Sequence, residues 1–461
     1  MSSSKKVYLI LILGFFLSIS YSFYNLSKFD KHDSLKKHHL MIRGDLNLIW
    51  KEAETFKKDF FQYDKSYFIS GIEYTRTYLP SKIIALYSEI TNYELYDDFE
   101  QNIISEEGKR LYLLFQTILF YISLLFFYSK LKIFTNNEKI SIYIISFLSL
   151  EPTILQWHST FWTESLYFTL QIIFLSILID TNNVYSKFLK LGIVIGLMFF
   201  QKTVSIFLII PVVLYFLINK FDKKIINIFI LISTYLFFII FLGFNNYKKT
   251  GIFYILPSQT KDAHYTYLIP QIFEKKDNFS EYYDYKYSIE KKWKDLNNFD
   301  QNNFKDLHKF YKFKQSVAIE EMLENKLIVT KIYLNKILHH FLLNPVQTFY
   351  WHEYNKSNYK IQYHLSKDKQ KWLIFRFIYS FFIFSIMFLG LIRILNLSIK
   401  LKFHCLVLVC IIYYSIMLGW VGNTRYFMPS MIFLSLFFGQ GIIAIEKLFN
   451  KYLKKNNLFF N

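Results

Sequence analysis

Six polar residues in a mostly apolar chain are the candidates for chemistry. Four of them stand in or beside a long apolar run, and the other two follow the first such run by about twenty residues. A carboxylate at such a position can take up a proton, and lysine or arginine can hold an anion. Charge at membrane depth is costly and usually faces a cavity or a partner. We therefore predict a site for an anionic lipid-linked substrate, with Asp45 catalytic and the others substrate-binding. The six residues are Arg43, Asp45, His158, Glu164, Lys202 and Arg425.

Several of these residues also have a structural interpretation, which the sequence leaves open. Asp45 can cap a helix that begins at Leu46, because its carboxylate would accept from free backbone N–H groups. Glu164 can be a first-turn acid favoured by the helix dipole, with Thr163 as the cap. His158 can be a structural histidine. The sequence alone does not separate these roles from chemistry.

Composition predicts the elements that must position the candidates. The chain has 461 residues, 53% of them hydrophobic and 21% aromatic, and its apolar residues arrive in long blocks. Such blocks can cross a hydrocarbon layer of about 30 Å, where an open chain satisfies its backbone only as a helix. The predicted fold class is all-α, a polytopic helical membrane protein with about ten transmembrane helices. The predicted spans lie near 7–24, 111–129, 140–156, 162–179, 186–200, 203–219, 225–244, 372–393, 403–420 and 426–446.

Loop charges predict the orientation of the spans. With a cytoplasmic amino terminus, most loop lysines lie inside, and the short outer loops carry only Lys202 and Arg425. Lone basic residues at span ends often extend toward the interface, but two on the outer side are less readily explained that way. We predict a multi-pass protein of the cell inner (plasma) membrane with both termini cytoplasmic. The candidate residues then meet at the outer mouth of the bundle.

Two long polar segments fall outside and divide the chain into three predicted parts. Residues 1–244 form a transmembrane catalytic module whose first outer loop is 25–110. Residues 245–370 form an outer (periplasmic) segment, and residues 371–461 form the C-terminal transmembrane helices and a cytoplasmic tail. Within the outer segment, residues 320–345 are predicted to form one amphipathic helix on the outer face.

Other functions are disfavoured by what the sequence contains. The net charge of +19 would suit nucleic acid, but the lysines lie in short loops or beside acidic residues, so no nucleic-acid partner is predicted. Cys405 and Cys410 stand in one apolar run and are predicted to pack rather than pair. His339 and His340 lack the spacing of a metal motif. Without a phosphate loop, an ATP-driven pump is disfavoured.

Five motifs, in this order, resemble the membrane glycosyltransferases of the GT-C class, which include protein O-mannosyltransferases and aminoarabinose transferases of lipid A. MIRGDLNLIWKEAE is similar to the first outer loop, where the family places its catalytic acid, and RTYLPSKIIALYSEI resembles the Pro-containing segment that follows. EPTILQWHSTFWTES resembles the span that carries a Thr-Glu pair. GIVIGLMFFQKTVSIFLIIP is similar to two spans paired around a basic residue. GNTRYFMPSMIF resembles the closing Arg-Tyr and Pro span.

The resemblance implies transfer of a hexosyl or pentosyl group from a polyprenyl-phosphate donor to a hydroxyl of a lipid, glycan or protein acceptor. Asp45 would be the base, with inversion by direct displacement, and Arg43 would hold it ionised or contact phosphate. Glu164 would orient sugar hydroxyls or support Asp45. Lys202 and Arg425 would stabilise the departing phosphate. The membrane supplies the donor, no resident cofactor is implied, and a divalent metal is left open.

Two other functions remain open. An O-antigen-type polymerase or ligase would use a pyrophosphate-linked donor and rely on outer arginines, of which this chain has few. A non-enzymatic lipid-sugar flippase or transporter would spread polar residues along the depth of its spans and often show repeats. Here the polar residues gather at one edge, and no matched halves are visible.

Overall fold

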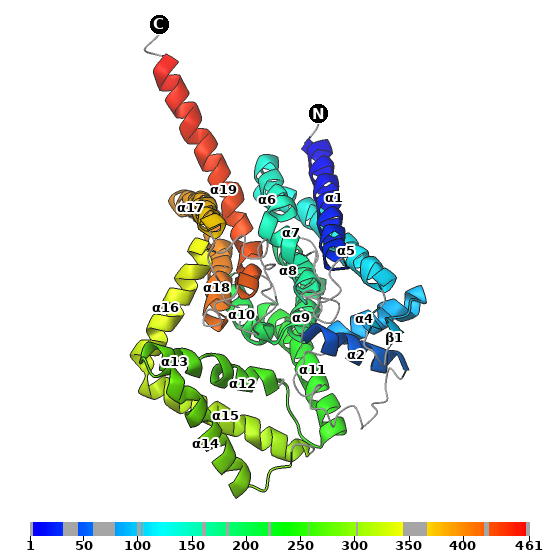
Figure 1. Ribbon diagram of the computed structural model, residues 1–461. Coiled ribbons are helices and arrows are strands. Elements are labelled where there is room, and N and C mark those ends of the chain that lie inside the picture. Colours follow the sequence, from blue (N-terminus) through cyan, green and yellow to red (C-terminus); the bar gives the residue numbers. More distant parts are fainter. Residues whose placement is uncertain are drawn as a thin grey trace.

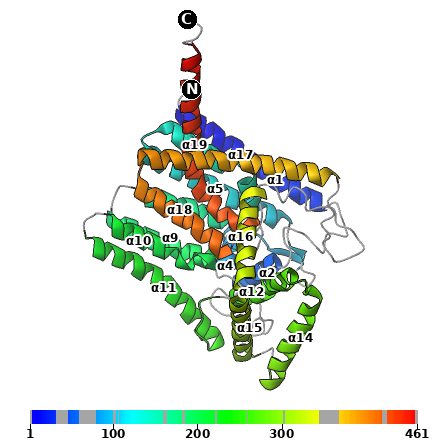
Figure 2. The same ribbon diagram turned by 90° about the vertical axis from the view of Figure 1, so that its left-hand side faces the viewer.

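The computed structural model describes residues 3–30, 45–58, 79–98, 103–104, 106–158, 163–180, 184–219, 223–256, 258–300, 303–343, 367–418 and 424–457. Across these ranges the chain is helical apart from a short antiparallel ribbon of β1 (Tyr96–Asp98) and β2 (Ile103–Ile104). The predicted helical fold class is therefore confirmed. Both chain termini lie at the top of Figures 1 and 2, and α14 (Phe279–Leu296) lies at the bottom.

The apolar helices share one hydrophobic core, which contains residues from both ends of the chain, such as Val7, Phe120, Tyr167 and Met428. Its helices are α1 (Ser3–Asp30), α5 (Glu106–Thr135), α6 (Glu138–Leu150), α7 (Pro152–His158), α8 (Glu164–Ile179), α9 (Val184–Gln201), the 3-10 helix η3 (Thr203–Phe207), α10 (Ile209–Ile218), α11 (Lys224–Thr250), α17 (Lys367–Leu397), α18 (Leu401–Leu418) and α19 (Thr424–Asn457).

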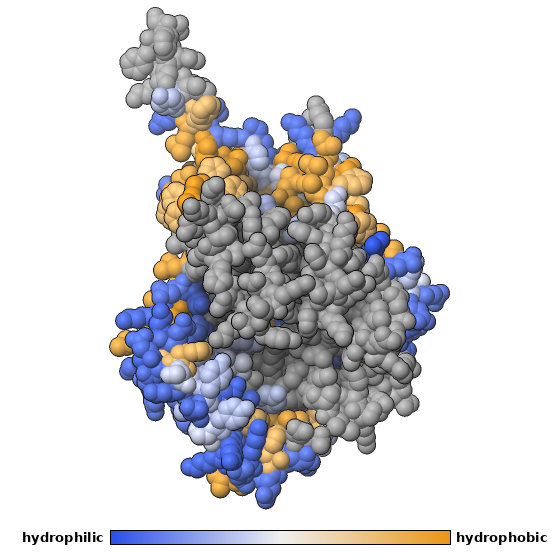
Figure 3. Space-filling model, viewed as in Figure 1, coloured by the Kyte–Doolittle hydropathy of each residue, from blue (hydrophilic) through white to orange (hydrophobic). Residues whose placement is uncertain are grey.

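Among the described residues, five helices are long and apolar enough to cross a membrane: stretches of α1, α5, α11, α17 and α19. Three shorter apolar helices lie at Glu164–Ile179, Thr203–Ile218 and Leu401–Met417. Large hydrophobic side chains are exposed on α11 and α17, among them Phe229, Phe237 and Phe381, as expected where a helix faces lipid. Figure 3 shows the apolar surface around the upper helices and mostly hydrophilic surface below. The count of ten spans stays a prediction.

Two of the predicted spans are divided in the structure. The segment 140–156 breaks at Glu151, whose backbone is extended (φ −65°, ψ 123°), because the Pro152 ring disfavours a helical conformation in the residue before it. The segment 203–219 begins as the 3-10 helix η3 before α10 starts. By contrast, the predicted break between the fifth and sixth spans is confirmed, since α9 ends at Gln201 and Lys202 is extended.

The helix predicted for 320–345 is also wrong as a single element. It is divided at Asn325 between α15 (Phe304–Glu324) and α16 (Lys326–Leu343). The side-chain amide of Asn325 donates to the Glu321 carbonyl at 2.8 Å. This side-chain bond to the backbone competes with regular helix, which explains the break.

Lysines predicted to lie on the inner side bond to the carboxyl ends of neighbouring helices. Lys187 donates to the carbonyls of Leu178 and Asp180 at 2.8 and 2.7 Å, at the end of α8. Lys402 donates to the Ile218 carbonyl at 3.2 Å, at the end of α10. Helix carboxyl ends carry unpaired carbonyls and negative dipole charge. These lysines therefore stabilise helix ends, a role separate from the one predicted for them in topology.

Two smaller groups of helices lie outside the main bundle, and they contain three hydrophobic clusters among the described residues. The helices α2 (Asp45–Lys58) and α4 (Leu79–Thr91) pack on the start of α5 through Trp50, Phe56 and Tyr112. The helices α12 (Ser258–Tyr267), α13 (Ile269–Lys275), α14, α15 and α16 form a separate helical unit. Figure 1 shows α2 and α4 beside α9, and the second unit below the bundle.

Two glycines allow α17 and α19 to cross at close range. A Cβ on Gly390 would lie 1.9 Å from the Phe437 carbonyl oxygen, and one on Gly441 would lie 1.9 Å from that of Ile386. Small residues permit this backbone approach between membrane helices. At the crossing, the backbone of α19 therefore leaves no room for a side chain at position 390, and the backbone of α17 leaves none at position 441.

We expect Gly390→Ala to lower the free energy of unfolding by about 1–3 kcal/mol through overpacking. This effect opposes the gain of about 0.5–1 kcal/mol that alanine brings in an unobstructed helix. Thermal unfolding in detergent measures it, with the exposed Phe388→Leu on the same helix as the control. A stabilised Gly390→Ala variant would show that the two backbones do not approach so closely.

Candidate functional site

A buried ion pair joins two of the predicted site residues. The Lys202 ammonium lies 2.6 Å from Oε1 of Glu164, although the residues are 38 positions apart. The Glu164 side chain is 0% exposed and that of Lys202 is 10% exposed. Such a pair is retained in an apolar interior only when charge and hydrogen bonds are well matched. The structure thus brings Glu164 and Lys202 into contact. The sequence analysis expected both residues at the same end of the bundle.

Local structure explains how Lys202 reaches Glu164. Lys202 stands between α9 and η3 with extended backbone (φ −147°, ψ 120°), and its amide donates to the Met198 carbonyl at 2.8 Å. The neighbouring Gln201 side chain donates to the carbonyl of Thr163 at 2.9 Å, directly before α8. Thr163 makes no side-chain cap bond. The start of α8 and the end of α9 are therefore fastened together at the pair.

A network of three hydroxyl groups is linked to the ion pair through the Tyr167 ring, and the sequence analysis did not identify it. The Tyr167 hydroxyl lies 2.5 Å from that of Ser205 and 2.6 Å from that of Tyr414. The Lys202 ammonium is 5.6 Å from the centre of the Tyr167 ring, within reach of a cation–π attraction. We call Glu164, Tyr167, Lys202, Ser205 and Tyr414 the Glu164–Lys202 cluster. Tyr167 was detectable in part, because it follows Glu164 by three residues on one helix face.

Two further tyrosines hold the 3-10 segment that follows Lys202. The Tyr235 hydroxyl donates to the Ile206 carbonyl at 2.5 Å, and the Tyr413 hydroxyl donates to the Val204 carbonyl. Backbone carbonyls in an apolar interior must be paired. These tyrosines of α11 and α18 therefore fix η3, and with it the position of Lys202.

The beginning of α19 reaches the same level of the bundle as α8. The Gln171 side chain of α8 donates to the Pro429 carbonyl of α19 at 3.2 Å. Gln171 lies two turns after Glu164, and Arg425 lies about one turn before Pro429. The backbone of Arg425 is thereby brought toward the level of the cluster. Its side chain lies outside the part of the structure that is described.

Asp45 is the first residue of α2, one position before the predicted helix start at Leu46. Its helix packs against α4, and α4 in turn packs against α9, the helix that leads into Lys202. The side chains of Asp45 and of His158, the last residue of α7, lie outside the described part of the structure, as does the whole of Arg43. The predicted roles of these three residues stay predictions.

Glu151 is a buried carboxylate that the sequence analysis did not select. Its Oε2 accepts from the Ile154 amide at 2.8 Å, and its Oε1 accepts from the hydroxyls of Thr153 at 2.9 Å and Tyr379 at 3.2 Å. The carboxylate therefore caps α7 and joins it to α17. Because Pro152 follows it, the helix break itself was a signal for such a cap.

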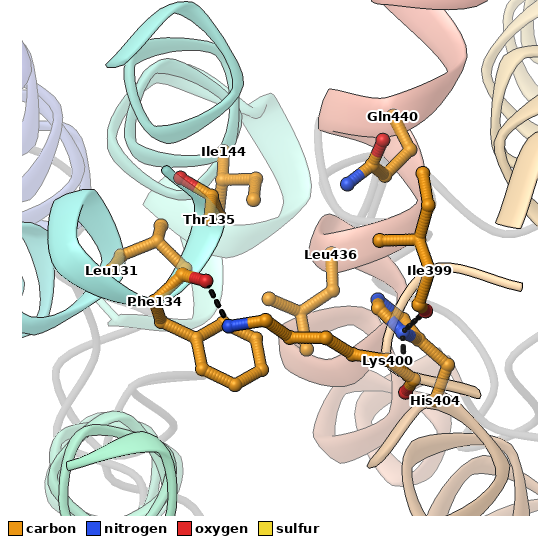
Figure 4. A pocket seen from close by; sticks show the side chains of 9 residues that line it. All are labelled: Leu131, Phe134, Thr135, Ile144, Ile399, Lys400, His404, Leu436 and Gln440. Atoms are coloured by element: carbon orange, nitrogen blue, oxygen red, sulfur yellow. Dashed lines mark hydrogen bonds between the residues drawn. The ribbon is translucent and has the colours of Figure 1, made fainter. Parts of the chain in front are cut away.

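The small cavity in Figure 4 lies away from the Glu164–Lys202 cluster. It is lined by His404 of α18, ten positions before Tyr414, which corresponds to about 15 Å along a helix. Lys400 donates to the Phe134 carbonyl, and His404 Nδ1 lies 2.9 Å from the Ile399 carbonyl oxygen. A volume of about 30 Å³ has room for roughly two water molecules. We assign it no substrate.

Within the described ranges, no group of three or more His, Cys, Asp or Glu side chains is arranged to hold a metal ion. A divalent metal therefore stays an open prediction. Cys405 is exposed, Cys410 is buried, and neither forms a disulfide.

The fold and the buried ion pair define the class: a helical membrane protein with a charged cluster enclosed among apolar helices. Comparison of the chain with protein-family models, with curated proteins and with solved structures gives no match. The resemblance to GT-C glycosyltransferases therefore stands on the motif order of the sequence.

Proposed function

We propose that this protein is an integral-membrane glycosyltransferase that moves a sugar from a polyprenyl-phosphate donor to an acceptor hydroxyl. The observation that carries the proposal is the buried ion pair between Glu164 and Lys202. Ionisable groups enclosed in a membrane bundle are costly and commonly mark a substrate path. A lipid-linked phosphate is an anion whose apolar tail brings it to such a bundle. The order of the sequence motifs supports the same function.

We also propose the finer topology: about ten spans in the cell inner membrane, both termini cytoplasmic, and residues 25–110 and 245–370 periplasmic. The bonds from Lys187 and Lys402 support it, because each joins a lysine predicted to be cytoplasmic to the end of a helix that is also predicted to be cytoplasmic.

In the proposed reaction, the acceptor oxygen bonds to the anomeric carbon while the bond from that carbon to the phosphate oxygen breaks. The electron pair leaves with the polyprenyl phosphate, and the hydroxyl proton passes to Asp45. Lys202, positioned by Glu164, and Arg425 stabilise the charge that grows on phosphate. Attack opposite the leaving group gives inversion.

The remaining candidates have supporting roles in this proposal. Arg43 keeps Asp45 ionised, since a nearby cation favours the carboxylate, and His158 contacts the substrate. Tyr167 positions Lys202 through its ring, and its hydroxyl fastens α8 to η3 and α18.

The test uses the purified full-length protein in nanodiscs, with membranes of a deletion strain as the source of acceptor. Radiolabelled glucose, mannose and 4-amino-4-deoxyarabinose are supplied on polyprenyl phosphate, and transfer to lipid, glycan or protein is measured. The same sugars on polyprenyl pyrophosphate are the matched control. We expect transfer from one monophosphate donor and none from the pyrophosphates.

The other outcomes overturn the proposal in distinct ways. Transfer from a pyrophosphate donor alone would assign the protein to the polymerase or ligase class. Movement of an intact lipid-linked sugar across the bilayer without transfer would make it a flippase. Absence of both activities with all donors would remove the enzymatic assignment.

A further inference from the structure

The helix α16 has two apolar faces, of which only one is buried in the protein. Val329 and Ile332 are 9% and 3% exposed and pack with Leu268 and Ile272. These residues belong to the helical unit of α12 to α16, which we call the outer unit. On the opposite face, three leucines separated by seven and four positions form a row that we call the leucine stripe. It consists of Leu327, Leu334 and Leu338, which are 74%, 56% and 56% exposed. The stripe requires an apolar partner.

Charge distinguishes α16 from the other helices of its unit. Its sequence, KLIVTKIYLNKILHHFLL, has three lysines and two histidines and no acidic residue. The helices α12, α13, α14 and α15 each contain aspartate or glutamate. Lys326 and Lys331 are exposed beside the stripe. A helix with leucines and lysines on one exposed face suits an anionic lipid surface.

The position of α16 places the stripe near the bilayer. The helix packs on both α17 and α18, which are apolar helices of the bundle. Figures 1 and 2 both show α16 connecting the outer unit to these helices. The start of α17 also exposes apolar side chains, Ile374 at 59% and Phe375 at 52%. Both α17 and the neighbouring α16 thus expose apolar side chains.

We propose that α16 is a membrane-surface helix whose leucine stripe inserts into the adjacent leaflet while Lys326 and Lys331 contact anionic lipid headgroups. The outer unit is thereby fixed at a set distance from the bundle. The leucines supply apolar contact, and the lysines favour lipids whose headgroups carry a net negative charge. This inference does not depend on the glycosyltransferase activity.

The test places spin labels on the full-length protein in nanodiscs that contain phosphatidylglycerol and phosphatidylcholine. Leu334→Cys and Leu338→Cys are made separately in a Cys405→Ala, Cys410→Ala background. Leu296→Cys on α14, which is 74% exposed, is the matched control. Accessibility to oxygen, which concentrates in lipid, is compared with accessibility to a water-soluble nickel chelate.

We expect oxygen accessibility to exceed chelate accessibility at both stripe positions and the reverse at position 296. Replacing Lys326 and Lys331 by glutamate should lower the oxygen-to-chelate ratio at the stripe. Stripe labels that behave like the control would overturn the insertion, and so would labels protected from both reagents, since protein would then cover the stripe. An unchanged ratio in the glutamate variant would overturn the contact with anionic headgroups.

Discussion

Replacing Lys202 with methionine lowers the free energy of unfolding by about 3–5 kcal/mol. The loss arises because Glu164, whose side chain is 0% exposed, would be left buried without the ammonium that balances it. Replacing both residues, in Glu164→Gln/Lys202→Met, removes both charges and restores most of the stability. With the single variant Glu164→Gln added, denaturant or thermal unfolding of the detergent-solubilised protein provides the three free-energy differences of a double-mutant cycle.

An exposed ion pair of the same chemistry is the control for this cycle. Lys132 and Glu138 lie 2.9 Å apart with side chains 49% and 31% exposed. We expect Lys132→Met to change the free energy of unfolding by no more than about 1 kcal/mol. Equal effects of Lys132→Met and Lys202→Met would mean that the Glu164–Lys202 pair is not enclosed. The double variant should remain inactive in transfer, which separates the stability of the pair from its chemistry.

The second prediction concerns Asp45 and separates catalysis from capping. Asparagine caps a helix about as well as aspartate does, so Asp45→Asn should leave abundance and thermal stability unchanged. It removes the proposed base, and we expect the transfer rate to fall by about 10²- to 10⁴-fold. Asp45→Ala should lose the same activity and, in addition, about 1 kcal/mol of stability through loss of the cap.

Glu54→Gln, on the same helix, is the matched control for loss of a carboxylate and should keep normal activity. Transfer is measured with the donor that the nanodisc assay identifies. Normal turnover of Asp45→Asn combined with reduced stability of Asp45→Ala would show that Asp45 acts only as a helix cap. The catalytic base would then have to be sought elsewhere.

Much of the helical architecture could be predicted because apolar blocks and their interruptions are local features. The break at Lys202 was visible as two polar residues in an apolar run, and the structure ends α9 there. The break at Glu151 was missed, since hydropathy averages over a proline that acts through backbone sterics. The division at Asn325 was missed for a similar reason, because one amide bond to Glu321 decides it.

The candidate site was only partly accessible to the sequence. Topology placed Glu164 and Lys202 at one level, but their 2.6 Å contact depends on the turn between α9 and η3. Tyr414 could not be found, because it meets Tyr167 across 247 positions and its hydroxyl has no periodic signature. Glu151 stands in a motif that the sequence analysis quoted, yet its role needs Tyr379 from a distant helix.

The bond between Tyr167 and Tyr414 also sets a condition on biosynthesis. Tyr167 leaves the ribosome 247 residues before its partner, a delay of about 10–50 seconds at about 5–20 residues per second. During that time α18 has not yet been made, so the Tyr167 hydroxyl lacks its Tyr414 partner, although its bond to Ser205 can already form. Maturation of this protein must therefore include a late docking event, in which newly inserted α18 displaces lipid from a polar seam.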